Sequence, residues 1–157
     1  MKDEEAAADG SLVVVRDAQG QAGLQAGKAF AIGEVVSRFG AREERREPDY
    51  LTVQVGPGRH ITLDPPYLQY TNHSCEPNVL FDTARGEIVA LAEIAPGDAI
   101  TFFYPSTEWA MDRPFACLCG TPSCLGTIAG ASQLDPAQLA GFRLAPHIAE
   151  MLDNAEA

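Results

Sequence analysis

The four cysteines of this chain are the residues whose spacing most clearly indicates chemistry. Three of them fall within the segment CLCGTPSC, residues 117–124, and the fourth, Cys75, stands alone well before that segment. Structural zinc prefers four tetrahedral ligands, so a cluster of three thiols is one ligand short. Cys75 can supply the missing ligand. The spacing therefore predicts one structural zinc ion per chain, held by Cys75, Cys117, Cys119 and Cys124, with no coordination position left open for water.

Two other interpretations of the cysteines stay open at this point. Four cysteines allow three disulfide connectivities, although Cys117 and Cys119 are too close in sequence to bond readily to each other. Free core thiols are the second alternative. The first residues, MKDEEAAADG, are acidic and do not resemble a secretory signal. We therefore expect a cytoplasmic protein, in which zinc is favoured over disulfides.

Three motifs follow one another in the chain: NHSCEPN at residues 72–78, GDAITFFY at residues 97–104 and the cysteine segment at residues 117–124. In this order the motifs resemble the SET-domain family of protein lysine methyltransferases that carry a post-SET zinc-binding motif. The resemblance covers roughly residues 11–130. It implies a mainly β fold, with small curled β-sheets around a threaded, knot-like segment and short C-terminal helices. It also implies that S-adenosylmethionine is the methyl donor.

The same resemblance implies a set of cofactor-binding residues. Asn72 and His73 match the Asn-His pair that holds S-adenosylmethionine, and Phe115 and Leu118 are candidates to wall the adenine. The remaining matches are Ala22, Gly23 and Tyr50. The chain departs from the family pattern at Gln21, where a glycine is usual. Taken alone, Tyr50 is equally compatible with a strand aromatic in the core, and the His73 ring with a core histidine.

The resemblance assigns catalysis to Tyr104, which ends the second motif. Methyl transfer to an amine needs a neutral amine, and an unperturbed lysine with a pKa near 10.4 is neutral in only about one molecule in 2,500 at pH 7. An apolar channel lowers this pKa, and a tyrosine hydroxyl can orient the amine, which we favour over a role as base. The expected channel residues are Phe102, Tyr70 and Trp109, although Trp109 can equally anchor a long loop. Phenylalanine at position 102 implies that two or three methyl groups can be added.

The elements that must position these residues are mostly short strands. Alternating patterns and turns predict strands within residues 11–15, 28–39, 50–55, 59–63, 79–82, 87–91 and 98–103. Residues 40–49 are expected to form a charged loop or short helix. Asp135 followed by Pro136 predicts a helix start, and a second helix is expected near Pro146. The expected organisation is a disordered acidic tail at residues 1–10, a SET domain at residues 11–105, a zinc-binding segment at residues 106–130 and a helical extension at residues 131–157.

Composition sets the class of partner. The 22 acidic and 11 basic residues give a net charge of −11, which opposes direct binding to nucleic acid and favours a basic protein or peptide. No apolar run is long enough to cross a membrane. We expect a protein-lysine methyltransferase acting on a basic, lysine-containing protein of the histone or ribosomal type, and the sequence does not indicate an oligomeric state. The alternative is a catalytically silent SET-like module that binds basic partners through its acidic surface.

Overall fold

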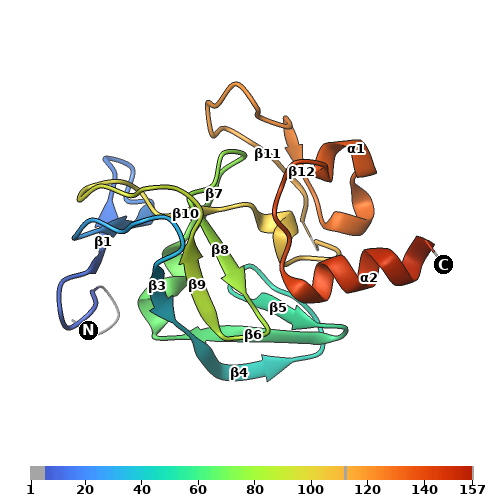
Figure 1. The fold of residues 1–157 in the computed structure, drawn as a ribbon, viewed down its shortest axis with the longest axis horizontal. Helices are drawn as coiled ribbons and strands as arrows, with labels where there is room; N and C mark the ends of the chain where they lie inside the picture. Colours follow the sequence, from blue (N-terminus) through green and yellow to red (C-terminus); the bar gives the residue numbers. More distant parts are fainter. Residues whose placement is uncertain (1–5, 112, 157) are drawn as a thin grey trace.

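Short β-sheets form most of the structure, a computed structural model that describes residues 6–111 and 113–156 (Figure 1). The first sheet pairs two strands, and two further sheets contain three strands each. In sheet order, these are β1 (Leu12–Arg16) and β2 (Ala22–Ala26); β3 (Val35–Arg38), β9 (Glu87–Ala90) and β8 (Val79–Asp82); and β4 (Gly40–Arg45), β6 (Arg59–Asp64) and β5 (Val53–Gly56). All these pairings are antiparallel, and β1–β2, β5–β6 and β8–β9 are joined by short connections.

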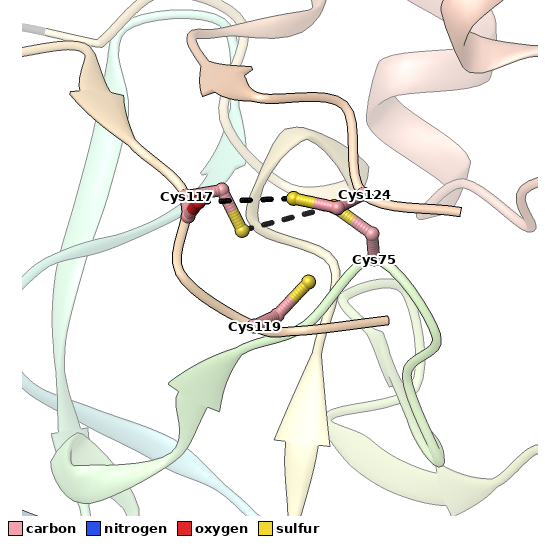
Figure 2. A group of neighbouring side chains, drawn as sticks. All are labelled: Cys75, Cys117, Cys119 and Cys124. Atoms are coloured by element: carbon pink, nitrogen blue, oxygen red, sulfur yellow. Dashed lines mark hydrogen bonds between the residues drawn. The ribbon is translucent and has the colours of Figure 1, made fainter. Parts of the chain in front are cut away.

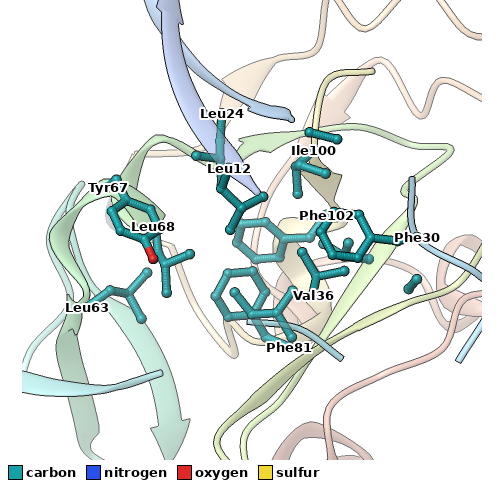
Figure 3. Close-up of a cluster of buried hydrophobic side chains, with 14 of the residues drawn as sticks. Leu12, Leu24, Phe30, Val36, Leu63, Tyr67, Leu68, Phe81, Ile100 and Phe102 are labelled. Carbon is teal, nitrogen blue, oxygen red and sulfur yellow. The ribbon is translucent and has the colours of Figure 1, made fainter. Parts of the chain in front are cut away.

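One hydrophobic core joins the three sheets (Figure 3). Alternation along β5 and β6 turns Val53, Ile61 and Leu63 inward. The rings of Phe81 and Phe102 lie 4.4 Å apart at the centre of this core. Other core side chains come from every sheet and from the 3-10 helix η2 (Pro66–Tyr70), and include Leu12, Leu24, Val36, Leu68, Ile88 and Ile100. The predicted mainly β fold is confirmed.

Two very short strands bring the first two sequence motifs together. Strand β7 (Asn72–His73) pairs in parallel with β10 (Thr101–Phe102). Beyond the pair, the Ser74 amide donates to the Phe102 carbonyl over 3.0 Å. The 3-10 helix η3 (Tyr104–Ser106) follows β10 directly. Segments that are far apart in the sequence therefore lie side by side at Tyr104.

The chain after residue 106 forms a separate end of the molecule, opposite β1 and β2 (Figure 1). Its elements are β11 (Phe115–Ala116), β12 (Thr127–Ile128), the 3-10 helix η4 (Ala131–Gln133), α1 (Pro136–Leu139) and α2 (Pro146–Glu156). Both helices begin where the sequence predicts, and Asp135 caps α1 by accepting from the Ala137 amide. Among the described residues, no helix is long and apolar enough to cross a membrane.

Several predicted elements differ in extent. The segment Gly40–Arg45 is a strand, not a loop or helix, because its backbone pairs with β6 while all its side chains stay exposed. Strand β5 begins only at Val53, and β10 covers only two residues of the predicted 98–103 strand. Within residues 28–39 only β3 is a strand, while Phe30 forms an isolated bridge with Ile94. Residues 1–5 of the predicted tail lie outside the described residues, and Ala6 bridges to Val13.

Candidate active site

The four cysteines converge on one point (Figure 2). Their sulfur atoms all lie within 4.8 Å of one another, and none is in a disulfide. A tetrahedral ion with Zn–S bonds of about 2.3 Å separates its sulfurs by about 3.8 Å. The Sγ atoms of Cys75 and Cys117 are 3.9 Å apart, so the cluster fits a zinc ion. Zinc bound here would have four thiolates and no open position, and would act on structure alone.

The surroundings of the thiols suit a metal site. Burial raises the pKa of Cys75 to about 12, so this sulfur needs a cation to become a thiolate. The Thr121 hydroxyl lies 3.2 Å from the Cys119 sulfur and lowers the pKa of that thiol to about 6. The Leu125 amide also donates to Cys75 Sγ over 3.4 Å. Such outer partners orient metal ligands.

His73 connects the cysteine cluster to Tyr104. Burial lowers the pKa of His73 to about 4, so its ring is neutral. The Tyr104 amide donates to His73 Nδ1 over 3.1 Å, which places the ring hydrogen on Nε2. Nε2 in turn lies 3.4 Å from Cys75 Sγ and donates to it. The His73 ring is therefore a satisfied, half-buried histidine that fixes the start of the Tyr104 turn against the cysteine cluster.

A cavity of about 590 Å³ lies between η2, the β5 segment and the chain around Tyr104. Phe102 and Tyr104 form part of its wall, with ring centroids 4.8 Å apart. Phe115 forms another part, and its ring lies 5.9 Å from that of Tyr104. Tyr50 also lines the cavity, with a side chain that is 93% exposed, so it stands at the mouth and is not a core strand aromatic. Further apolar lining comes from Leu51, Val53, Leu63, Leu68 and Met111.

Tyr104 presents a protonated hydroxyl at this cavity. Burial raises its pKa to about 12; the backbone amide of His73 opposes that rise, and the charge of Glu108 adds to it. The hydroxyl points toward the Thr71 carbonyl, 3.4 Å away. A tyrosine that holds its proton at neutral pH can orient a substrate amine but is a poor base.

The predicted cofactor residues Ala22, Gly23, Asn72 and His73 gather next to Tyr104. The Asn72 side-chain amide donates to the Ala22 carbonyl over 3.1 Å. A Cβ added to Gly23, in β2, would lie only 3.1 Å from Asn72 Nδ2, so the absence of a side chain lets this strand pass close to Asn72. The fit to S-adenosylmethionine rests on these preorganised amides and carbonyls. Gln21 is exposed and directly precedes β2.

The structure does not bring every predicted site residue to the cavity. Tyr70 packs against the main core under the Arg16 guanidinium, 5.8 Å from its ring centre. Trp109 packs in the C-terminal hydrophobic cluster with Leu139 and Ile148, as the loop-anchor alternative proposed. Leu118 is 93% exposed and walls nothing among the described residues.

Phe103 has a clear structural role. It is 1% exposed and stacks on Phe142, with ring centroids 3.7 Å apart and planes 4° from parallel. This stack fastens the C-terminal extension to the end of β10.

Glu108 is a buried residue of the cavity wall that the sequence motifs do not indicate. In the sequence, Glu108 is the first charged residue after Asp98 and lies four positions beyond Tyr104, which ends the second motif. Thr71 also lines the cavity without having been predicted, since nothing in a strand or turn pattern shows which polar residues face a cavity.

Comparison with known proteins identifies the family. A model of the SET domain matches residues 21–105. The chain belongs to the SET-domain family. Methyltransferase flvH of Aspergillus flavus is 39% identical over 126 residues, which cover 79% of this chain and 70% of that protein. The H3 lysine-36-specific histone-lysine N-methyltransferase of Saccharomyces cerevisiae is 29% identical over 121 residues, or 68% of this chain but only 16% of that much longer protein.

Solved SET-domain structures show the same fold. KRYPTONITE in complex with mCHG DNA and SAH superposes with a TM-score of 0.59 at 22% identity, over 74% of this chain and 28% of that chain. Together with the site, these findings confirm the predicted family, the fold and an S-adenosylmethionine-dependent methyltransferase. The catalytically silent alternative is not favoured. The SET-domain match ends at residue 105, and the cysteine cluster after it fits zinc by its own geometry.

We expect Asn72→Ala to weaken S-adenosylmethionine binding on the order of tenfold, because about 1–1.5 kcal/mol accompanies the loss of one partly buried hydrogen bond. Calorimetric titration of the cofactor measures this change. Asn78→Ala is the matched control. The Asn78 side chain also hydrogen-bonds backbone groups, donating to the Ala99 carbonyl and accepting from the Thr101 amide, but it lies away from Ala22. Equal affinity in wild type and Asn72→Ala would remove Asn72 from the cofactor site.

Proposed function

We propose that this SET-domain protein methylates lysine side chains of a basic protein. The observation that carries the proposal is the cavity wall itself, where apolar side chains and the Tyr104 hydroxyl meet. A lysine side chain has a long apolar stem and a basic tip, which matches an apolar wall with one hydroxyl at its side. The relatives include proteins named histone-lysine N-methyltransferases, which supports the same substrate class.

Each part of the chain has a role in this proposal. Val53, Leu63, Leu68 and Phe102 line the cavity and remove water from the amine, which lowers the lysine pKa. Tyr104 orients the nitrogen through its protonated hydroxyl. Ala22, Gly23 and Asn72 would hold S-adenosylmethionine, which supplies the methyl group as a sulfonium.

The charge of the chain supports a basic partner. A net charge of −11 steers cationic segments toward the protein and repels phosphate backbones. We propose a lysine-rich protein segment as substrate and no direct contact with nucleic acid, unlike KRYPTONITE, which was solved in complex with DNA. A reducing compartment suits four free thiols, so we propose a cytoplasmic location.

The substrate is tested by radiolabelled methyl transfer into a panel of lysine-rich proteins, histones included, followed by mass-spectrometric mapping of the labelled residue. The expected result is label on a lysine ε-amine. Label confined to another residue type or to small amines would contradict the lysine-protein substrate while leaving the methyltransferase assignment in place.

We also propose that the enzyme adds more than one methyl group. Phe102 has no hydroxyl that could hold a water molecule in the space that a second methyl group needs. Phe102→Tyr supplies that hydroxyl and is expected to shift the product from di- or trimethyl-lysine to monomethyl-lysine, as read by mass spectrometry of the modified peptide. Exclusive monomethylation by wild type, unchanged in Phe102→Tyr, would show that this ring does not limit the methyl count.

A further inference from the structure

Glu108 is a buried carboxyl in the wall of the cavity, only 9% exposed. One of its oxygens, Oε2, accepts two hydrogen bonds. The backbone amide of Gln54 donates over 2.9 Å, and the Thr107 hydroxyl donates over 2.7 Å. These two bonds fix the direction of the carboxyl group. The proposed methyl transfer, as described so far, makes no use of it.

The other oxygen of the Glu108 carboxyl is Oε1. Within the part of the chain that the structure describes, it has no hydrogen-bond partner, yet it is not among the buried polar atoms that lack one, which are His60 Nδ1 and Ser106 Oγ. An unpartnered oxygen that is not fully buried must reach open space, and Glu108 lines the same cavity as Tyr104. Oε1 is therefore free to accept from a bound group.

A purely structural role does not require a charged residue at this position. A glutamine could accept the same two hydrogen bonds with its amide oxygen and would avoid the cost of burying a carboxylate. Burial raises the pKa of Glu108 to about 7. The hydrogen bonds from the backbone amide of Gln54 and from the Thr107 hydroxyl act in the opposite direction and lower this pKa. A group with such a pKa can both accept and release a proton near neutrality.

The other ionisable groups around Glu108 are few. Asp49, Tyr50, Tyr104 and Arg113 line the cavity, and Asp49 already accepts from the Leu51 amide and from Arg45. Behind the carboxyl, His60 is the strand partner of Gln54, and His147 bonds the Thr107 carbonyl. The described cavity wall contains two carboxyl groups, those of Asp49 and Glu108. Both oxygens of Asp49 accept hydrogen bonds, so Glu108 is the one with an oxygen available to a bound group.

We propose that Oε1 of Glu108 binds the substrate amine in its charged form and takes its proton before methyl transfer. This role deepens the lysine methylation proposed above and rests on it. One N–H bond of the ammonium breaks, an O–H bond forms on Oε1, and the nitrogen keeps the electron pair that it needs as a nucleophile. The carboxylic acid then returns the proton to water through the open mouth of the cavity.

The first test measures kcat/KM across pH for wild type and Glu108→Gln. The substrate is a peptide containing the lysine that the wild-type enzyme methylates. Wild-type kcat/KM should rise as Glu108 ionises near pH 7 and then level off. Glu108→Gln must wait for an amine that solvent has already deprotonated, which at pH 8 is roughly one in 250. We expect a loss of at least tenfold at pH 8 that shrinks to less than about threefold at pH 10. A loss that is constant with pH would indicate a structural effect and would overturn the proposal.

Glu34→Gln is the matched control. Glu34 is also a carboxylate that holds a backbone amide, that of Ala31, but it lies on the β3 side of the molecule, outside this cavity. Its variant removes the same charge and should keep the wild-type pH profile. Thermal melting of both variants checks that they are folded.

The second test does not need turnover. Zinc-loaded protein with bound SAH is titrated with n-butylamine, which reproduces the tip of a lysine side chain, and with n-butanol, which lacks the charge. Binding of n-butylamine at pH 8 should weaken at least tenfold in Glu108→Gln, while n-butanol should bind both proteins equally. Equal binding of the amine to both proteins would overturn the role of Glu108.

The two tests separate this proposal from the proposed function. Glu108-dependent amine binding without methylation of any protein lysine would remove the protein substrate and keep the amine site. Lysine methylation that is unaffected in Glu108→Gln would keep the function and remove Glu108 from it.

Discussion

Replacement of Tyr104 by phenylalanine is expected to lower turnover by roughly two orders of magnitude, the low end for a positioned catalytic group. The ring of Tyr104 packs among those of Phe102, His73 and Phe115, and phenylalanine keeps all of these contacts. Only the hydroxyl beside the Thr71 carbonyl is lost. Radiolabelled methyl transfer measures turnover, and calorimetry should show a cofactor affinity close to that of wild type.

The matched control is Tyr67→Phe, which removes a hydroxyl from a tyrosine buried in the main core and away from the cavity. Its turnover should remain close to wild type even if its melting temperature falls. Wild-type turnover in Tyr104→Phe would mean that the hydroxyl has no part in orienting the amine, and the silent binding module would then become the better description.

Residues with unusual chemistry were the most predictable part of the site. The cysteine spacing predicted one cluster because thiols that bind one ion must meet, however far apart they lie in the sequence. Asn72 and Tyr104 were predictable because they sit in motifs, and the parallel pairing of β7 with β10 brings those motifs together. The helix starts at Pro136 and Pro146 followed from local backbone preferences.

Residues whose role depends on which way a side chain faces were not predictable in this way. Tyr70 and Trp109 are aromatic neighbours of the motifs, yet they pack against the main core and the C-terminal cluster. The charged strand β4 gave no hydrophobic alternation, because it is an edge strand with every side chain exposed. Glu108 required knowledge of both its burial and its free oxygen, which only tertiary structure provides.

The cysteine cluster and the cavity depend on each other through a shared wall. Buried Cys75, Cys117 and Ile128 pack with Tyr104 and Phe115 in one hydrophobic cluster. The segment between β11 and β12 has only two-residue strands to hold it. A metal ion bound by the four cysteines would therefore add order to the part of the chain that supplies Phe115 to the cavity.

Purified protein is expected to contain about one zinc ion per chain, and Cys75→Ser is expected to lose it. Cys75 lies far from the CxCx4C segment in sequence, but its sulfur sits 3.9 Å from that of Cys117. Serine is a poor zinc ligand at neutral pH, and a structural site contributes on the order of 10 kcal/mol to folding. We expect a large fall in the melting temperature and protease cleavage within residues 105–130, followed by loss of methyl transfer.

Elemental analysis measures the zinc content, and Ser123→Ala is the matched control because Ser123 is an exposed residue next to the ligand Cys124. That variant should keep its metal and its melting temperature. Full zinc in Cys75→Ser would contradict the four-cysteine site and leave the CxCx4C segment to find its fourth ligand elsewhere. Loss of zinc with unchanged methyl transfer would instead separate the metal from the cavity, since Phe115 and Tyr104 would then hold their places without it.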